Sequence, residues 1–325
     1  MIPGKIAVEE HWTSPDYVRY MPAIGLRSKV QDGAVQALQD LSGRLEEMDR
    51  HGIAVAVLML NSHGIQGEPD RDRAVAGARQ ANDLLGEAIS AHPDRFVALA
   101  AVAMQAPQAA AEELERAVRE LRFRGACVNG FCDVGDHETG RYYEERAFDP
   151  FWERLQELGV PLYLHPRSPL PRNLGLYEGH LELVGPTWAW GVETATHALR
   201  LITGGVFDRF PGVNVVLGHL GETLPFAVDR MEKRLTYMSD LGLERPVGAY
   251  FRENFYVSTS GNFHTQSLLG SIAELGAERV LFAVDYPFEQ MATASDWFDA
   301  VPLAPADREK IARTNAARLF AIDSG

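Results

Sequence analysis

The sequence is poor in cysteine and in basic residues, and it lacks long hydrophobic runs. Only Cys127 and Cys132 occur among 325 residues, so disulfide bonds do not hold the fold together, and a reducing cytoplasm is the expected location. Lysine and arginine number 31 against 45 aspartates and glutamates, which gives a net charge of −14. This balance argues against nucleic acid or a membrane as a partner, because both attract basic surfaces. No apolar run approaches the roughly 20 residues of a membrane span, and we expect no signal peptide.

What the sequence does contain is a regular alternation of short apolar runs and amphipathic segments. The apolar runs are rich in β-branched residues, as parallel strands buried on both faces are. Strands are predicted at 6–8, 54–60, 96–103, 126–128, 162–164, 213–217, 255–258 and 280–284. Helices are predicted at 35–50, 71–91, 109–121, 150–158, 194–203, 224–238, 265–275 and 291–300, with a last helix at 305–319.

Eight strand–helix units predict an α/β fold, a TIM-like (β/α)8 barrel with a C-terminal helix and loop insertions. The competing architecture is a doubly wound open sheet, whose dinucleotide site would need a glycine-rich turn after the first strand. Two glutamates and a histidine follow that strand instead, which favours the barrel. No repeat or linker divides the sequence, so residues 1–325 are expected to form a single domain. The polar segment 133–141 is expected to be an exposed loop, and 166–186 a long insertion.

Polar residues stand where the predicted strands end, and the active site of such a barrel lies at those ends. Glu9 and His11 are two apart on an extended chain, so they point to the same face. His165 ends another strand and Asp285 ends the last. A single histidine in such a place is more often a hydrogen-bonded core residue, but four coordinated positions favour a site. Two carboxylates and two imidazoles suit one divalent ion, Zn²⁺ or Mn²⁺.

A second metal ion is not expected. Two-metal sites of this architecture often use a modified lysine at the end of the fourth strand as a bridge, and Asn129 stands there instead. An open coordination position on the single ion would make the site catalytic rather than structural.

Long motifs spread over nearly the whole chain carry a family likeness. They include GKIAVEEH, RFRGACVNGF, PLYLHPRSPLP, VVLGHLGETLPF and VLFAVDYPFE. Through them the chain resembles the amidohydrolase superfamily, in the branch of metal-dependent, non-oxidative decarboxylases that includes aminocarboxymuconate-semialdehyde decarboxylase. Within that branch it resembles most the γ-resorcylate (2,6-dihydroxybenzoate) decarboxylases. The resemblance implies a carboxy-lyase of aromatic compound catabolism that is a homodimer or homotetramer and acts on a small aromatic carboxylate.

The resemblance also assigns roles to individual residues. Its metal ligands fall on the four residues already proposed, Glu9, His11, His165 and Asp285. Its G-H-x-G-E motif falls on His219 and Glu222, its helix arginine on Arg230, and its asparagine on Asn129. Arg230 and Asn129 are expected to hold polar groups of the substrate, and Trp188 to form part of the pocket wall.

The expected substrate is a benzoate with a hydroxyl group ortho to the carboxylate. Asp285 is the expected donor of a proton to the ring carbon, and His219, paired with Glu222, would orient or shuttle that proton. Loss of CO2 then leaves a phenol, and the reverse carboxylation follows from microscopic reversibility.

Two positions bear on the choice of substrate. Relatives that act on 2,3-dihydroxybenzoate or 5-carboxyvanillate tend to carry alanine where His11 stands, which favours γ-resorcylate. The segment after the first strand departs from the family pattern, in which a phenylalanine packs on the substrate. Met21 or Ile24 is expected to take that place.

Two other classes of function remain open at this point. The same metal site could activate water, with Asp285 as general base, and hydrolyse a small lactone or amide. A non-catalytic metal-binding protein is a third hypothesis, although ligands at strand ends have no obvious structural purpose there.

Overall fold

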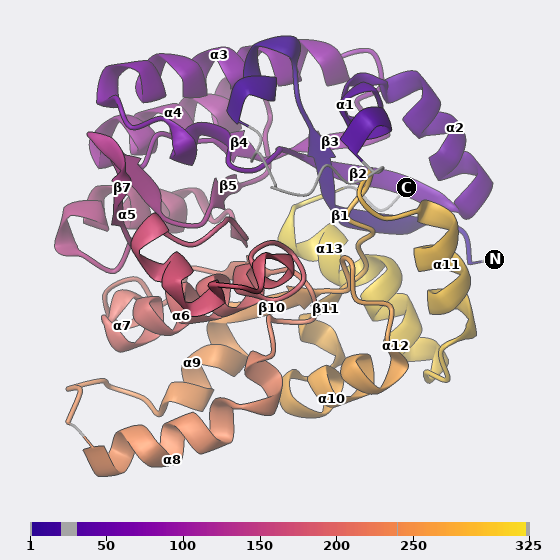
Figure 1. Ribbon diagram of the computed structural model, residues 1–325. Coiled ribbons are helices and arrows are strands. Elements are labelled where there is room, and N and C mark those ends of the chain that lie inside the picture. Colours follow the sequence, from indigo (N-terminus) through magenta and orange to yellow (C-terminus); the bar gives the residue numbers. More distant parts are fainter. Residues whose placement is uncertain (1, 21–30, 239, 323–325) are drawn as a thin grey trace.

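The computed structural model describes residues 2–20, 31–238 and 240–322 (Figure 1). Its barrel strands are β1 Lys5–Trp12, β2 Ile53–Leu60, β3 Phe96–Ala98, β4 Ala100–Ala101, β5 Ala126–Asn129, β8 Leu162–His165, β9 Val215–Leu217, β10 Phe255–Ser258 and β11 Val280–Leu281. A separate hairpin consists of β6 Cys132–Val134 and β7 Asp136–Arg141.

The helices follow the strands along the chain and surround them in Figure 1. They are α1 Gln31–Gln39, α2 Leu41–His51, α3 Arg71–Ile89, α4 Pro107–Glu120, α5 Asp149–Leu158, α6 Ala189–Thr203, α7 Val206–Arg209, α8 Val228–Met238, α9 Val247–Asn254, α10 Thr265–Leu275, α11 Met291–Ala300, α12 Pro305–Glu309 and α13 Asn315–Leu319. None of the helices in the described ranges combines the length and apolar character that a membrane crossing requires.

The parallel strands close into a barrel. They form two sheets, in the orders β1-β2-β3 and β11-β10-β9-β8-β5-β4, and only Leu99 separates β3 from β4. At the other junction the Val8 N–H donates to the Phe282 carbonyl at 3.2 Å, and the Asp285 N–H donates to the Glu9 carbonyl at 3.0 Å. The first and last strands are therefore neighbours, as a (β/α)8 barrel requires.

The barrel interior is filled by side chains rather than left as a channel. Every second residue of a strand points inward, and the inward residues of all the strands form one apolar cluster. Its buried members are Ile6, Val8, Val57, Met59, Leu99, Cys127, Tyr163, Val216, Tyr256, Leu281, Ala283, Ala316, Ala317 and Phe320. The C-terminal residues from α13 onward thus close one end of the barrel, and polar side chains occupy the other.

The structure differs from the sequence-based prediction in several places, three of which bear on the site or its surroundings. β1 continues through the two glutamates and His11 as far as Trp12. The helix predicted at 35–50 is two helices, because the Asp40 side chain accepts the Gly43 N–H at 2.8 Å and begins α2 as its N-cap. The loop predicted at 133–141 is largely the hairpin β6–β7, and its first residue, Asp133, is buried against Arg167 at 3.0 Å.

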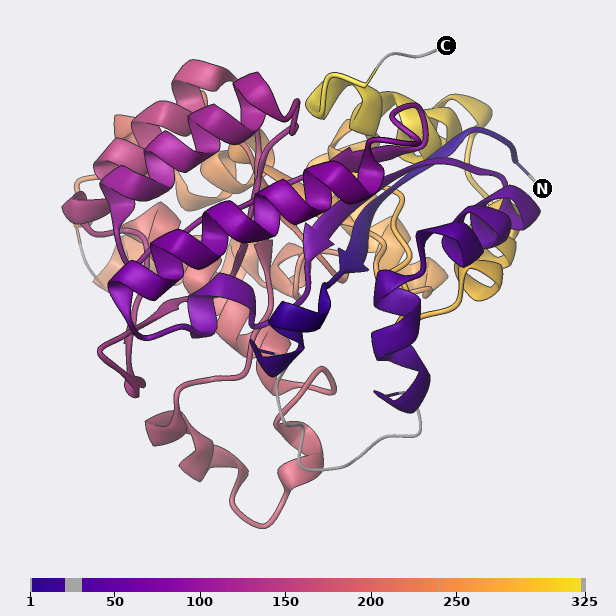
Figure 2. The same cartoon turned by 90° about the horizontal axis from the view of Figure 1, so that it is seen from above.

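The long insertion expected at 166–186 contains two 3-10 helices, Pro171–Tyr177 and Leu181–Leu183. In Figure 2 this segment extends away from the strands. Its Leu176 and Leu181 side chains are exposed.

Candidate active site

Four side chains, three of them buried and that of Asp285 partly exposed, meet where β1 and β8 end and just after β11. Glu9 and His11 belong to β1, His165 ends β8, and Asp285 follows β11, and one ligand atom of each lies within 4.8 Å of the others. His11 Nε2 lies 2.9 Å from Asp285 Oδ1, and His165 Nε2 lies 3.4 Å from Glu9 Oε1. The structure thus brings together the four residues that the sequence grouped as metal ligands.

The chemistry of this cluster fits one divalent metal ion. Glu9 is fully buried, and its Oε1 atom has no hydrogen-bond partner among the described residues. A buried carboxylate oxygen without a donor is costly unless a cation compensates it. Two carboxylates and two imidazoles are also a donor set that Zn²⁺ and Mn²⁺ accept.

The other carboxylate oxygen of Glu9 is held by hydroxyl groups. The hydroxyls of Tyr163, Ser258 and Ser260 all donate to Oε2, that of Ser258 at 3.2 Å. A Cβ atom on Gly218 would lie 2.7 Å from the same oxygen. The sequence reading missed these hydroxyl donors, although Tyr163 stands two residues before His165 on β8 and therefore faces the same way.

Burial and the neighbouring charges shift the ionisation of the ligands. Burial raises the pKa of Glu9, with the nearby histidines opposing it. Burial lowers the pKa of His165 well below its ordinary value and keeps the imidazole neutral, the form that binds metals. Burial alone would raise the pKa of Asp285, but its hydrogen bonds to His11 and His219 outweigh that effect and hold the pKa below its usual range.

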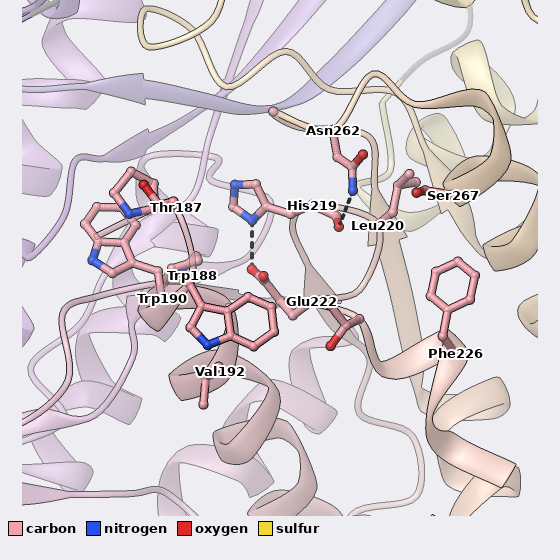
Figure 3. A pocket seen from close by; sticks show the side chains of 15 residues that line it. Thr187, Trp188, Trp190, Val192, His219, Leu220, Glu222, Phe226, Asn262 and Ser267 are labelled. Carbon is pink, nitrogen blue, oxygen red and sulfur yellow. Dashed lines mark hydrogen bonds and ion pairs between the residues drawn. The ribbon is translucent and has the colours of Figure 1, made fainter. Parts of the chain in front are cut away.

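His219 and Glu222 form a pair beside the ligands (Figure 3). His219 Nδ1 lies 2.7 Å from Glu222 Oε1, while its Nε2 lies 3.6 Å from Asp285 Oδ2 and 3.9 Å from Glu9 Oε1. Burial by itself would lower the pKa of His219, but these three carboxylates raise it well above its ordinary value. The neighbouring carboxylates therefore favour the protonated form of His219, which faces the four clustered side chains.

A cavity of about 270 Å³ opens onto this pair. Trp188 and Trp190, which lie before and at the start of α6, form one side of it, and Phe226 and Ser267 lie on another (Figure 3). Asn262 donates to the His219 carbonyl at 3.3 Å. The sequence prediction placed Trp188 in the pocket wall, and its side chain does line this cavity while remaining half exposed.

Two other predicted substrate-binding residues do not line this cavity. Asn129 is buried at the end of β5, beside His165 of β8, and its Nδ2 donates to the Leu60 carbonyl at 3.4 Å. Arg230 is exposed on α8. Their roles toward the substrate therefore stay predictions. Met21 and Ile24, expected to pack on the substrate, lie outside the described residues.

Comparison with known proteins gives consistent matches over the full length. Residues 32–322 match a protein-family model described as amidohydrolase. A γ-resorcylate decarboxylase of Rhizobium sp. strain MTP-10005 is 47% identical over 98% of this chain and 99% of that protein. An enzyme of the same name from Rhodococcus jostii strain RHA1 is 46% identical over 98% and 99%.

Solved structures agree with these sequence matches. A crystal structure of 2,6-dihydroxybenzoate decarboxylase complexed with 2,6-dihydroxybenzoate has a TM-score of 0.95 and 46% identity, and covers 99% of this chain and 100% of that one. A dihydroxybenzoic acid decarboxylase from Polaromonas sp. JS666, with bound manganese and the inhibitor 2-nitroresorcinol, has a TM-score of 0.93 and 43% identity, and covers 100% and 98%.

Proposed function

The chain belongs to the amidohydrolase family and is a metal-dependent decarboxylase of hydroxybenzoates, and we propose that its substrate is γ-resorcylate (2,6-dihydroxybenzoate). The observation that carries this proposal is the cluster of Glu9, His11, His165 and Asp285 at the mouth of the barrel. Full-length likeness to decarboxylases of this substrate supports it. The presence of His11, where alanine is expected in relatives with other substrates, supports it further.

The four clustered side chains would hold one ion, Mn²⁺ or Zn²⁺. Bound manganese in a similar structure favours Mn²⁺. Such a cation supplies positive charge that favours the ionised form of a phenol ortho to the carboxylate.

The remaining residues deliver a proton to the ring carbon that bears the carboxylate. His219 would store the proton, because the carboxylates of Glu222, Glu9 and Asp285 raise the pKa of its imidazole. Its Nε2 faces Asp285 Oδ2 at 3.6 Å, so the proton passes to Asp285 and from there to the ring carbon. Protonation turns that carbon tetrahedral, the bond to the carboxylate then breaks, and its electron pair restores the aromatic ring as CO2 leaves.

Glu222 orients the imidazole of His219. It accepts a hydrogen bond from His219 Nδ1 at 2.7 Å, which fixes the orientation of the ring and turns Nε2 toward Asp285. The tryptophans beside the cavity, Trp188 and Trp190, would pack against the ring of the substrate.

The remaining proposals concern the whole chain. Residues 1–325 would act as one domain, since β1 and the chain just after β11 are hydrogen-bonded to each other within one barrel. A homodimer or homotetramer is proposed because Phe226, Tyr237 and Met238, on or next to α8, expose large apolar side chains. A cytoplasmic location is proposed because both cysteines are free thiols.

A substrate panel tests the proposed function. The manganese-loaded protein is incubated with γ-resorcylate, 2,3-dihydroxybenzoate, 5-carboxyvanillate and a set of lactones and amides. We expect CO2 and resorcinol from γ-resorcylate at the highest kcat/KM. Ring opening of a lactone without CO2 release would instead identify the hydrolase, and turnover of another hydroxybenzoate would correct the substrate.

A further inference from the structure

Arg44 is a fully buried arginine that contacts two segments of the site at once: the end of β1, at the His11 carbonyl, and the chain after β11, at the ring of Tyr286. It lies on α2, outside the barrel, and its side chain is 0% exposed. Its Nη2 donates to the His11 carbonyl at 2.5 Å and to the Ala37 carbonyl at 3.4 Å. Its guanidinium carbon lies 4.8 Å from the ring centre of Tyr286, the residue after Asp285.

The same junction of β1 and the chain after β11 contains a buried acid. Glu10, between Glu9 and His11, is also 0% exposed, and its Oε1 accepts the Val284 N–H at 3.1 Å. Burial raises the pKa of Glu10 to about 8, and the positive charge of Arg44 opposes that shift.

The backbone around these contacts carries the metal ligands themselves. The His11 N–H donates to the Tyr286 carbonyl at 2.9 Å, and β1 bridges to the chain after β11 at Glu10 and Tyr286. A shift of Arg44 would therefore move His11 and Asp285 relative to each other. Residues that contact metal ligands without binding the metal set the orientation of those ligands. Their removal typically changes metal affinity by 10- to 100-fold.

We propose that Arg44 is a positioning residue of the metal centre, which fixes His11 and Asp285 in register by holding the His11 carbonyl and the Tyr286 ring at once. The proposal rests on the proposed function, since it takes the four-residue cluster as a metal site. It differs from a purely structural role, in which Arg44 would only neutralise the buried Glu10.

The test is the affinity of the metal-free protein for Mn²⁺, measured by electron paramagnetic resonance. Arg44→Lys retains the charge opposite Glu10 but lacks the planar group that donates to the carbonyl while it packs on the ring. We expect its Mn²⁺ dissociation constant to rise about tenfold or more, with an altered spectrum of the bound ion. Arg50→Lys is the matched control, because Arg50 lies on the same helix with its side chain 57% exposed.

A double-mutant cycle separates positioning from charge neutralisation. Arg44→Gln removes the positive charge that acts on the buried Glu10, whereas Glu10→Gln with Arg44→Gln removes both ionisable groups and so protects the fold if the single variant does not fold. Positioning predicts that the double variant still binds Mn²⁺ weakly, although its thermal unfolding is close to that of the wild type. Wild-type affinity in the double variant, or in Arg44→Lys, would overturn the inference. If the wild type itself bound no Mn²⁺, the proposed function would fail instead.

Discussion

His219 and Glu222 face each other at 2.7 Å from a stretch of backbone that has left-handed conformation at both residues. Their φ angles are 51° and 53°, and those of Leu220 and Thr223 between and after them are 59° and 69°. Each such non-glycine residue costs of the order of 1–3 kcal/mol and persists only where the surroundings fix it. The turn after β9 thus holds an unfavourable conformation that orients the imidazole toward Asp285.

The first prediction concerns this pair. His219→Asn removes the proton store, and we expect kcat for γ-resorcylate to fall about 10²- to 10⁴-fold. Glu222→Gln keeps the hydrogen bond but weakens the charge that holds the proton, so its loss should be smaller. Steady-state kinetics at saturating Mn²⁺ measure both effects. Both variants should retain near wild-type Mn²⁺ affinity, and full activity in His219→Asn would rule out the proton path.

The second prediction concerns removal of the metal. Dialysis against a chelator should abolish activity, and added Mn²⁺ should restore it, because the cation held by the cluster would be what favours the ionised phenol of the substrate. His165→Ala should remain inactive at Mn²⁺ concentrations that fully restore the wild type. Chelator-treated protein that has no metal by elemental analysis and still decarboxylates would contradict the site.

The third prediction concerns space around Glu9. A Cβ atom in Gly218→Ala would lie 2.7 Å from Glu9 Oε2 and 3.0 Å from the Ser260 hydroxyl. The carboxylate must then move, and we expect weaker Mn²⁺ binding and a large loss of activity, both measured on purified protein. Gly175→Ala is the control, since its Cβ would meet nothing within 4 Å. Equal Mn²⁺ affinity in the two variants would show that Glu9 is not held as described.

The fourth prediction concerns stability and pH. His197 is buried beside Tyr142 and Tyr143, and burial lowers its pKa to about 3. The unfolded chain takes up this proton near pH 6.5, so the stability from the neutral histidine is complete above that pH and falls as the pH drops toward 3. We expect about 2 kcal/mol to be lost by pH 5.

Urea unfolding at pH 5 and pH 7 measures this loss. In His197→Gln the difference between the two pH values should shrink by about that 2 kcal/mol. His180→Gln should behave as the wild type, because the His180 side chain is 69% exposed. An unchanged difference in His197→Gln would show that this histidine is protonated in the folded protein.

Many limits of helices and strands could be predicted from the local pattern of apolar residues alone. The strand expected at 255–258 and the helices at 265–275 and 291–300 have these same limits in the structure. The short helix Val247–Asn254 was missed, because it is eight residues long and its stability comes from packing rather than from its own periodicity. Capping by Asp40 likewise divides a pattern that appears continuous in sequence.

The clustering of Glu9, His11, His165 and Asp285 could be predicted because strand ends meet at one face of a barrel, whatever their separation in sequence. The roles of Tyr163, Ser258 and Arg44 could not, because each depends on which side chains meet across the fold. Ser258 and Glu9 are 249 positions apart, and no local signal links them. The pKa shifts of His219 and Asp285 could not be predicted either, because they depend on which charged groups surround these side chains in the fold.

The junction of the first and last barrel strands has a consequence for biosynthesis. His11 and Asp285 are separated by 274 positions, so a ribosome must translate most of the message before both can approach the same ion. A nascent polypeptide that ends before Asp285 therefore lacks one of the four clustered side chains. The choice between manganese and zinc falls to the completed chain and to whichever cation is available when its two ends first meet.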